Sequence, residues 1–244
     1  MMKFAPHISI YDFEESKDIQ NEVIWSFLKN LKVISSSRQR FNIHVVRNIE
    51  DERQSLDGNI KSLWKFVSID QYFVMSDYEQ RFFLLDLISN CFLDVSESLG
   101  WEKVVINDAI EKTLTQNIEF EYSSKAIQNK TRDKSASVEI KLNKNKVSIW
   151  IVLSIKDNTN KIKKHLIDTT VAQVSFFHHF DKPLWITERN FGFQFKNGMT
   201  LSITLEDNQP EWSHARNTMD EWFKKSIDFN EKMTSEEMAN LLNK

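Results

Sequence analysis

One stretch, KVSIWIVLSIKD at Lys146–Asp157, constrains the fold more than any other part of the chain. If it forms a β-strand, successive side chains point to opposite faces of the sheet. One face then carries Val147, Ile149, Ile151, Leu153 and Ile155. The other face still carries Trp150 and Val152, so most of the strand is apolar on both sides. Such a strand is typical of a sheet centre that is buried on both faces.

Several other segments alternate apolar and polar residues, and these predict further strands. They are Ile8–Ile10, Phe41–Val45, Ile118–Tyr122, Val138–Leu142, Ile162–Ile167, Val174–Phe180, Leu184–Ile186, Phe191–Phe195 and Leu201–Leu205. Asn143–Lys146 predicts a tight turn, and Asn197–Gly198 predicts a type I′ hairpin turn. We expect residues 49–59 to be irregular, whereas Ile60–Met75 shows no clean period.

Other segments have a helical period. They are Asp18–Leu31, Ser76–Leu99, Glu102–Gln116, Pro210–Ile227 and a short segment that begins at Thr234. Ser76 and Glu79 have the spacing of a capping box, and Gly100 is placed to end the same helix. Because almost no loop separates the second and third helices, they are expected to form an antiparallel hairpin.

These elements predict an α+β fold. A meander-like antiparallel sheet of about six or seven strands is expected over residues 118–205. The helical hairpin of residues 76–116 is expected on one face of it, and the C-terminal helices on an edge or the other face. A length of 244 residues fits one domain, 1–244. If the chain divides, the boundary lies near residue 117, between a mostly helical 1–117 and a sheet-containing 118–244.

Charge is distributed unevenly along the chain, although the net charge of −3 is small. Residues 1–117 carry 13 basic and 18 acidic side chains, and residues 207–244 carry 5 and 8. Residues 118–206 carry 14 basic and 9 acidic side chains. A basic central part therefore lies between two acidic ones, an asymmetry that can steer a charged partner.

Composition argues against several functional classes. The four glycines, Gly58, Gly100, Gly192 and Gly198, are isolated, so no glycine-rich loop can cradle a phosphate or dinucleotide. The single cysteine excludes an intramolecular disulfide. Neither a signal peptide nor a stretch of about 18 apolar residues is visible. We therefore expect a cytoplasmic protein without a cofactor or a membrane contact.

Cys91 and the histidines have mainly structural interpretations. Cys91 belongs to the most apolar helix, where a buried thiol is expected. His178 and His179 precede Asp181, but adjacent histidines on a strand point to opposite faces and cannot share a metal ion without a bulge. His165, on a neighbouring segment, is the remaining candidate to pair with one of them.

Glu139-Ile140-Lys141 is the strongest candidate for a catalytic motif. Its E-x-K spacing resembles that of restriction-endonuclease-like nucleases, in which the carboxylate binds Mg²⁺ and the lysine steadies the attacking water. The resemblance implies a third role, that of an upstream carboxylate, for Glu121. It covers only these residues, and Glu15-Ser16-Lys17 has the same spacing. The family places a helix after this strand, whereas a further strand is predicted here.

Eleven basic and three acidic residues lie between Lys125 and Lys164. Such lysines can solvate a sheet edge, or they can form a surface that binds a protein or a nucleic acid. Nucleic acid is the weaker alternative, because no nucleic-acid-binding motif accompanies the lysines.

We predict a non-catalytic, cytosolic protein-binding protein, comparable with toxin-neutralising immunity proteins. The alternatives are an enzyme with an unfamiliar site, such as a divergent nuclease, and a nucleic-acid-binding protein. The predicted partner-binding residues are Lys141, Lys144, Lys146, Trp150, Lys161, Lys163 and Lys164.

Overall fold

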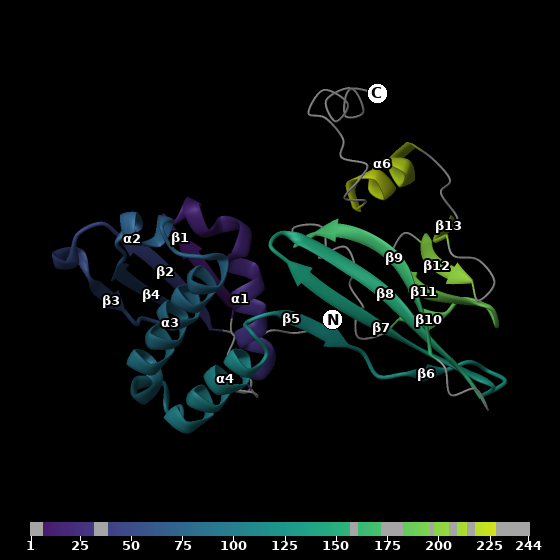
Figure 1. Ribbon diagram of the computed structural model, residues 1–244, viewed down its shortest axis with the longest axis horizontal. Coiled ribbons are helices and arrows are strands. Elements are labelled where there is room, and N and C mark those ends of the chain that lie inside the picture. Colours follow the sequence, from purple (N-terminus) through teal and green to yellow (C-terminus); the bar gives the residue numbers. More distant parts are fainter. Residues whose placement is uncertain are drawn as a thin grey trace. The chain divides into compact units, whose positions relative to one another are not determined.

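The computed structural model describes residues 7–31, 39–156, 161–171, 183–195, 198–204, 209–213 and 218–227. The chain forms two compact units (Figure 1). The first unit runs to Phe120 and includes the turn residues Asn143–Asn145. The second unit comprises Glu121–Leu142 and the chain from Lys146 onward. No helix in the described part of the chain combines the length and the apolarity that a membrane crossing requires.

A four-stranded sheet forms one layer of the first unit. Its strands, in spatial order, are β1 (His7–Tyr11), β2 (Arg40–Val46), β4 (Ile60–Phe66) and β3 (Arg53–Ser55). β1, β2 and β4 run parallel, and β3 pairs with β4 in the antiparallel direction. The predicted strands at residues 8–10 and 41–45 are confirmed, but the prediction of an irregular segment at residues 49–59 is wrong, since it contains β3.

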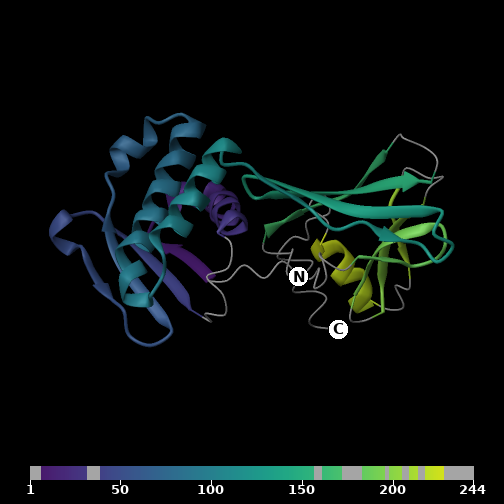
Figure 2. The same ribbon diagram turned by 90° about the horizontal axis from the view of Figure 1, so that it is seen from below.

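Helices form the second layer of this unit. They are α1 (Lys17–Asn30), α2 (Ile69–Phe73), α3 (Asp77–Ser96) and α4 (Lys103–Thr115), with short 3-10 turns η1 (Glu14–Ser16), η2 (Ile49–Asp51) and η3 (Glu97–Leu99). Phe92 of α3 stacks on Phe41 of β2, with ring centroids 4.5 Å apart, and meets Phe27 of α1 edge-on. Figure 2 shows these helices on one side of the sheet, so none of the helices described for this unit covers the opposite face.

The predicted ends of α3 are confirmed. Ser76 Oγ accepts a hydrogen bond from the Glu79 backbone N–H, and the Glu79 carboxylate accepts one from the Ser76 N–H at 2.7 Å. This capping box satisfies two backbone donors that the helix itself leaves unpaired. Gly100 follows at φ 66°, the left-handed conformation that ends a helix with least strain on glycine.

The second unit contains two sheets. The first has the order β5-β7-β8-β9, formed by β5 (Phe120–Ser123), β7 (Lys134–Asn143), β8 (Lys146–Ile155) and β9 (Ile162–Thr170), with β6 (Ile127–Gln128) paired to β7. β8, which the sequence predicted to be a central strand, lies between β7 and β9. Its face with Val147, Ile149 and Ile151 is fully buried, whereas Trp150 on the other face is half-buried.

The second sheet has the order β10 (Leu184–Trp185), β11 (Asn190–Gln194), β12 (Thr200–Thr204) and β13 (Glu211–Ser213), and α6 (Thr218–Ile227) follows. Figure 2 shows this sheet and α6 on the same side of the β5–β9 sheet. Lys164 of β9 donates to the Thr204 carbonyl at 2.9 Å, and Thr169 Oγ1 donates to the Ile227 carbonyl. A second sheet and a helix therefore cover the inner face of β7–β9.

The α+β class is confirmed, but the single sheet of six or seven strands is wrong. The strands of residues 118–205 divide between two sheets, and the 76–116 hairpin packs in the first unit instead of on them. The predicted helix from Pro210 is also wrong at its start, because β13 pairs with β12 there. The predicted strand at 174–180 and the helix from Thr234 lie outside the described residues.

The β11–β12 hairpin is confirmed by its register, Phe191 opposite Ile203 and Phe193 opposite Leu201. Next to the turn, the Phe195 N–H donates to the Met199 carbonyl at 2.8 Å, and Gly198 has φ 85°. The predicted type I′ turn depends on Asn197, which lies outside the described residues.

Candidate functional site

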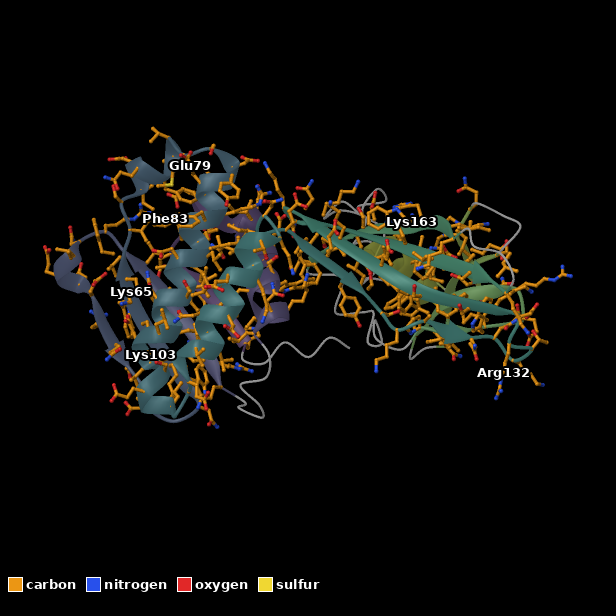
Figure 3. All side chains as sticks on the ribbon, turned by 60° about the horizontal axis from the view of Figure 1, so that its bottom comes forward. Lys65, Glu79, Phe83, Lys103, Arg132 and Lys163 are labelled. Carbon is orange, nitrogen blue, oxygen red and sulfur yellow. The ribbon has the colours of Figure 1, made fainter. Side chains whose placement is uncertain are left out.

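Trp150 lies on the outer face of the β5–β9 sheet among charged side chains. Lys163 Nζ is 4.7 Å from the Trp150 ring centre, a cation–π contact, and 2.6 Å from Glu139 Oε2. Lys141 Nζ donates to Glu121 Oε1 at 2.9 Å. These five side chains border a hollow of about 300 Å³, and Figure 3 shows Lys163 on this sheet. Both lysines are thus matched by carboxylates of the same sheet, which reduces the positive field that the sequence suggested.

Asp168, on β9, contacts two further basic side chains of this face, Lys146 and His165. Lys146 Nζ lies 2.7 Å from Asp168 Oδ2, and His165 Nε2 lies 3.0 Å from Oδ1. Burial by itself raises the pKa of the Asp168 carboxyl, but hydrogen bonds to Lys146, Ser148 and His165 outweigh burial and hold the pKa below its ordinary value. The carboxylate is therefore retained as a charged anchor for the Lys146 ammonium and the His165 ring.

The lowered pKa of Asp168 makes stability depend on pH. Because the folded-state pKa lies below the unfolded value of about 3.9, this group stabilises the fold above that pH, and the contribution is lost as pH falls through the folded pKa. We expect Asp168→Asn to have a lower free energy of unfolding than the wild type at neutral pH, and this difference to narrow as the pH falls below about 5. Urea unfolding of both proteins at a series of pH values measures this difference in unfolding free energy. A difference that does not change with pH would contradict a lowered pKa for Asp168.

Three other predicted partner-binding residues are placed apart from Trp150. Lys144 lies in the β7–β8 turn, where its Nζ is 3.4 Å from Asp77 Oδ2. Lys161 is exposed just before β9. Lys164 is only 6% exposed, because a register shift at Ile149/Trp150 places it opposite Ile151 on the inner face. Lys164 therefore does not belong to the outer surface, whereas Lys141, Lys146, Lys163 and Trp150 share that surface.

Glu139 and Lys141 share the outer face, as the nuclease-like spacing requires, but they have different partners. Glu139 pairs with Lys163, and Lys141 pairs with Glu121. Within the described ranges no group of three His, Cys, Asp or Glu side chains is placed to hold a metal ion. His178, His179 and Asp181 lie outside those ranges. The arrangement of Glu139 and Lys141 is that of two separate ion pairs on a sheet.

Cys91 is fully buried in α3, as expected for a core residue. Burial raises the pKa of its thiol to about 12, although the nearby Lys65 ammonium opposes this effect. Since the thiolate is the reactive form, Cys91 has no nucleophilic role at neutral pH.

A second surface, on the first unit, was not predicted. Four side chains form a continuous row across all four strands: Tyr11 of β1, His44 of β2, Trp64 of β4 and Arg53 of β3. The rings of Tyr11 and His44 stack with centroids 5.0 Å apart, and those of His44 and Trp64 with centroids 4.9 Å apart. The Arg53 guanidinium lies 4.5 Å from the Trp64 ring centre. We call these four residues the aromatic row.

The aromatic row is a direct consequence of strand register. Tyr11 is opposite His44, His44 opposite Trp64, and Trp64 opposite Arg53. Directly opposed side chains on one sheet face stand close enough for rings to stack. Interplanar angles of 17° and 12° show that the rings stand face to face along the row. His44 is therefore stacked between Tyr11 and Trp64, Trp64 between His44 and Arg53, and Tyr11 at the end of the row stacks on His44 by one face.

The surroundings of the aromatic row are mainly apolar or basic, although the carboxylate of Asp12, which follows β1, lies 3.6 Å from His44 Nδ1. Tyr11, Ile60 and Phe66 are 43%, 50% and 39% exposed. The other outward-facing strand positions are His7, Ser9, Arg40, Asn42, Val46, Ser55 and Ser62. No position on this face of the four strands is a carboxylate, although residues 1–117 are acidic as a whole. The face combines exposed apolar area with arginine, a composition typical of binding surfaces.

Sequence reasoning missed this surface for two reasons. It predicted the strands that hold Tyr11 and His44 only as isolated segments, and it treated the segment of Arg53 as irregular. The alternation of Trp64 with Phe66 is the signal that identifies β4. The pairing of β4 with both β2 and β3, which completes the row, is not visible in any local pattern.

No family model, curated protein or solved structure matches the chain at a significant level.

Proposed function

We propose that this chain is a non-catalytic protein-binding protein and that the face with the aromatic row is its main interface. The observation that carries the proposal is the row itself, in which Tyr11, His44, Trp64 and Arg53 form one stack. Trp, Tyr and Arg are the residues most enriched among those that dominate binding energy. Because each ring is held by its neighbours, little side-chain entropy is lost when a partner docks.

The geometry favours a protein over a nucleic acid as the occupant. A nucleobase binds an aromatic side chain by lying on an open ring face. In the aromatic row the faces of His44 are covered by Tyr11 and Trp64, and Arg53 lies over Trp64. Ring edges and the exposed Ile60 and Phe66 instead offer broad apolar contact. Arg40 and Arg53, on strands whose outward positions carry no carboxylate, favour an acidic surface on the partner.

A toxin with an acidic surface is one partner that fits this face, and this chain would then act as an immunity-type protein that neutralises it. The support is general: an exposed apolar and basic face on an otherwise acidic unit, which can steer and then bind an acidic surface. We place this function in the cytoplasm, because a chain with one buried cysteine and no disulfide suits a reducing compartment.

Charge reversal on the aromatic row tests the proposal. We expect the full-length wild-type chain to capture one dominant protein from its native host at physiological salt, and Arg53→Glu to lose it by repelling the acidic partner. Lys103→Glu makes the same charge change on an exposed residue of α4 (Figure 3) and is expected to retain the partner. Quantitative mass spectrometry of the captured protein provides the measurement.

Undiminished capture by Arg53→Glu would contradict the choice of this face. Trp150 and its lysines remain the second candidate surface, since Trp with a stacked lysine is also suited to an interface. Loss of the partner on Trp150→Ala, with Arg53→Glu unaffected, would transfer the proposal to the β5–β9 sheet.

A further inference from the structure

An open hollow of about 360 Å³ lies at the end of the β5–β9 sheet, and its lining shares no residue with the hollow around Trp150. It is bordered by the β6–β7 hairpin and the end of β8. Its polar lining consists of Gln128, Arg132, Asp133, Lys134, Ser135, Ser154 and Lys156. Figure 3 shows Arg132 at the tip of this sheet. Three cationic side chains and two hydroxyl groups therefore border the same space.

The cations of this hollow differ from the lysines around Trp150. Lys141, Lys146 and Lys163 each pair with a carboxylate of the sheet. In the described ranges, neither Arg132 nor Lys156 has an ion-pair partner. Uncompensated cations grouped around one hollow attract an anion.

Asp133 is the one carboxylate of the lining, and it is already engaged. Its Oδ1 accepts hydrogen bonds from Thr131 and Asn129, which hold the pKa of Asp133 at about 2. Its Oδ2 lies 3.5 Å from Lys134 Nζ. The carboxylate therefore offsets one lysine. Glu188, outside the lining, accepts hydrogen bonds from the same Asn129 and Thr131 at 3.1 and 3.2 Å, so Arg132, Lys134 and Lys156 exceed the two nearby carboxylates by one charge.

The backbone at Arg132 supports a role for this side chain. Arg132 has φ 61°, in the left-handed region that glycine adopts freely and other residues adopt at a cost of about 1–2 kcal/mol. The turn is closed by the Arg132 N–H to the Asn129 carbonyl and by the Asn129 N–H to the Lys134 carbonyl. Glycine would satisfy this turn with less strain, so arginine at this position is not explained by the fold.

We propose that this hollow binds a tetrahedral oxyanion of the phosphate class. Arg132 supplies a planar pair of donors that matches two phosphate oxygens, and Lys134 and Lys156 supply ammonium groups. Ser135 and Ser154, on neighbouring strands, add hydroxyl donors for the remaining oxygens. The volume leaves room for the group to which the phosphate is attached. This site is separate from the proposed protein interface and does not depend on it.

Titration calorimetry of the full chain with pyrophosphate at low ionic strength tests the site. We expect Arg132→Gly and Lys156→Gln each to weaken binding about tenfold, the loss expected for one charge-assisted hydrogen bond. Arg132→Gly also relieves the left-handed strain, so the loss of binding cannot be attributed to misfolding. Lys130→Gln, an exposed change in the same hairpin outside the lining, is expected to change affinity less than twofold.

Three results would overturn the proposal. The first is the absence of pyrophosphate binding at about 10 mM. The second is an equal loss for Lys130→Gln and Arg132→Gly, and the third is equal affinity for the dicarboxylate malonate, since either indicates general charge attraction. Vesicles that contain phosphatidic acid distinguish the source of the phosphate. Co-sedimentation that Arg132→Gly abolishes assigns the site to a lipid headgroup, whereas pyrophosphate binding without co-sedimentation assigns it to a soluble phosphate.

Discussion

Phe92→Ala is expected to destabilise the first unit by about 3–5 kcal/mol, the usual cost of truncating a fully buried phenylalanine. Phe92 is fully buried, and its ring meets Phe27 of α1, Phe41 of β2 and Trp101 of the segment before α4. Alanine leaves a cavity between α1, α3 and β2 that these aromatic rings cannot fill without leaving their rotamers. The loss would be a large part of the stability of a domain of this size.

Phe82→Ala provides the matched control, because Phe82 belongs to the same helix but is 47% exposed. Its expected cost is below about 1 kcal/mol. Guanidinium unfolding of both variants, followed by tryptophan fluorescence and by circular dichroism, measures the difference. Equal losses for the two variants would show that α3 does not bury Phe92 against the first sheet.

Gly192→Ala is expected to disrupt the β10–β13 sheet. A Cβ atom at position 192 would lie 2.1 Å from the Leu201 carbonyl oxygen and 2.6 Å from Ser202 Cα. Both are backbone atoms of the paired strand β12, so the strands must separate to accept a methyl group. We expect a loss of about 3 kcal/mol, at the upper end of the usual cost of overpacking.

Gly58→Ala is the control for the loss of a glycine. A Cβ at Gly58 meets no atom within 4 Å, and only its φ of 55° opposes a side chain. The expected cost is about 1 kcal/mol. Hydrogen exchange of the β11 and β12 amides reports the outcome; protection in Gly192→Ala equal to that of the wild type would contradict the close approach of these strands.

Elements with a strong local signal were predictable. The capping box of Ser76 and Glu79 identifies the start of α3, and Gly100 identifies its end, because both depend on residues that are adjacent along the chain. The alternation in Lys146–Ile155 identified β8 for the same reason. The two halves of the β11–β12 hairpin were identified by alternation and by the glycine between them.

Long-range pairing was not predictable from these patterns. Nothing local indicates that β1, β2 and β4 pair in parallel, or that the strands after Ile118 divide into two sheets. Short strands such as β3 and β13 carry too few residues for a period to be visible. Their position depends on the neighbour that supplies their hydrogen bonds.

The candidate sites also depend on long-range strand pairing that local sequence patterns do not reveal. Lys163 and Trp150 were both singled out from the sequence, but their contact depends on the register shift between β8 and β9, which also turns Lys164 inward. The aromatic row requires the register of four strands at once. Single residues could be nominated from the sequence, whereas their combination into a surface required the paired strands.

The affinity of the purified full-length chain for its captured partner, measured by titration calorimetry, tests the central claim most directly. Trp64→Ala removes the centre of the aromatic row and is expected to weaken binding by about 30-fold or more, the loss that marks a dominant interface residue. Trp150→Ala makes the same truncation on the β5–β9 sheet and is expected to change affinity less than about threefold. Unchanged affinity for Trp64→Ala, in a variant whose circular dichroism equals that of the wild type, would contradict the account.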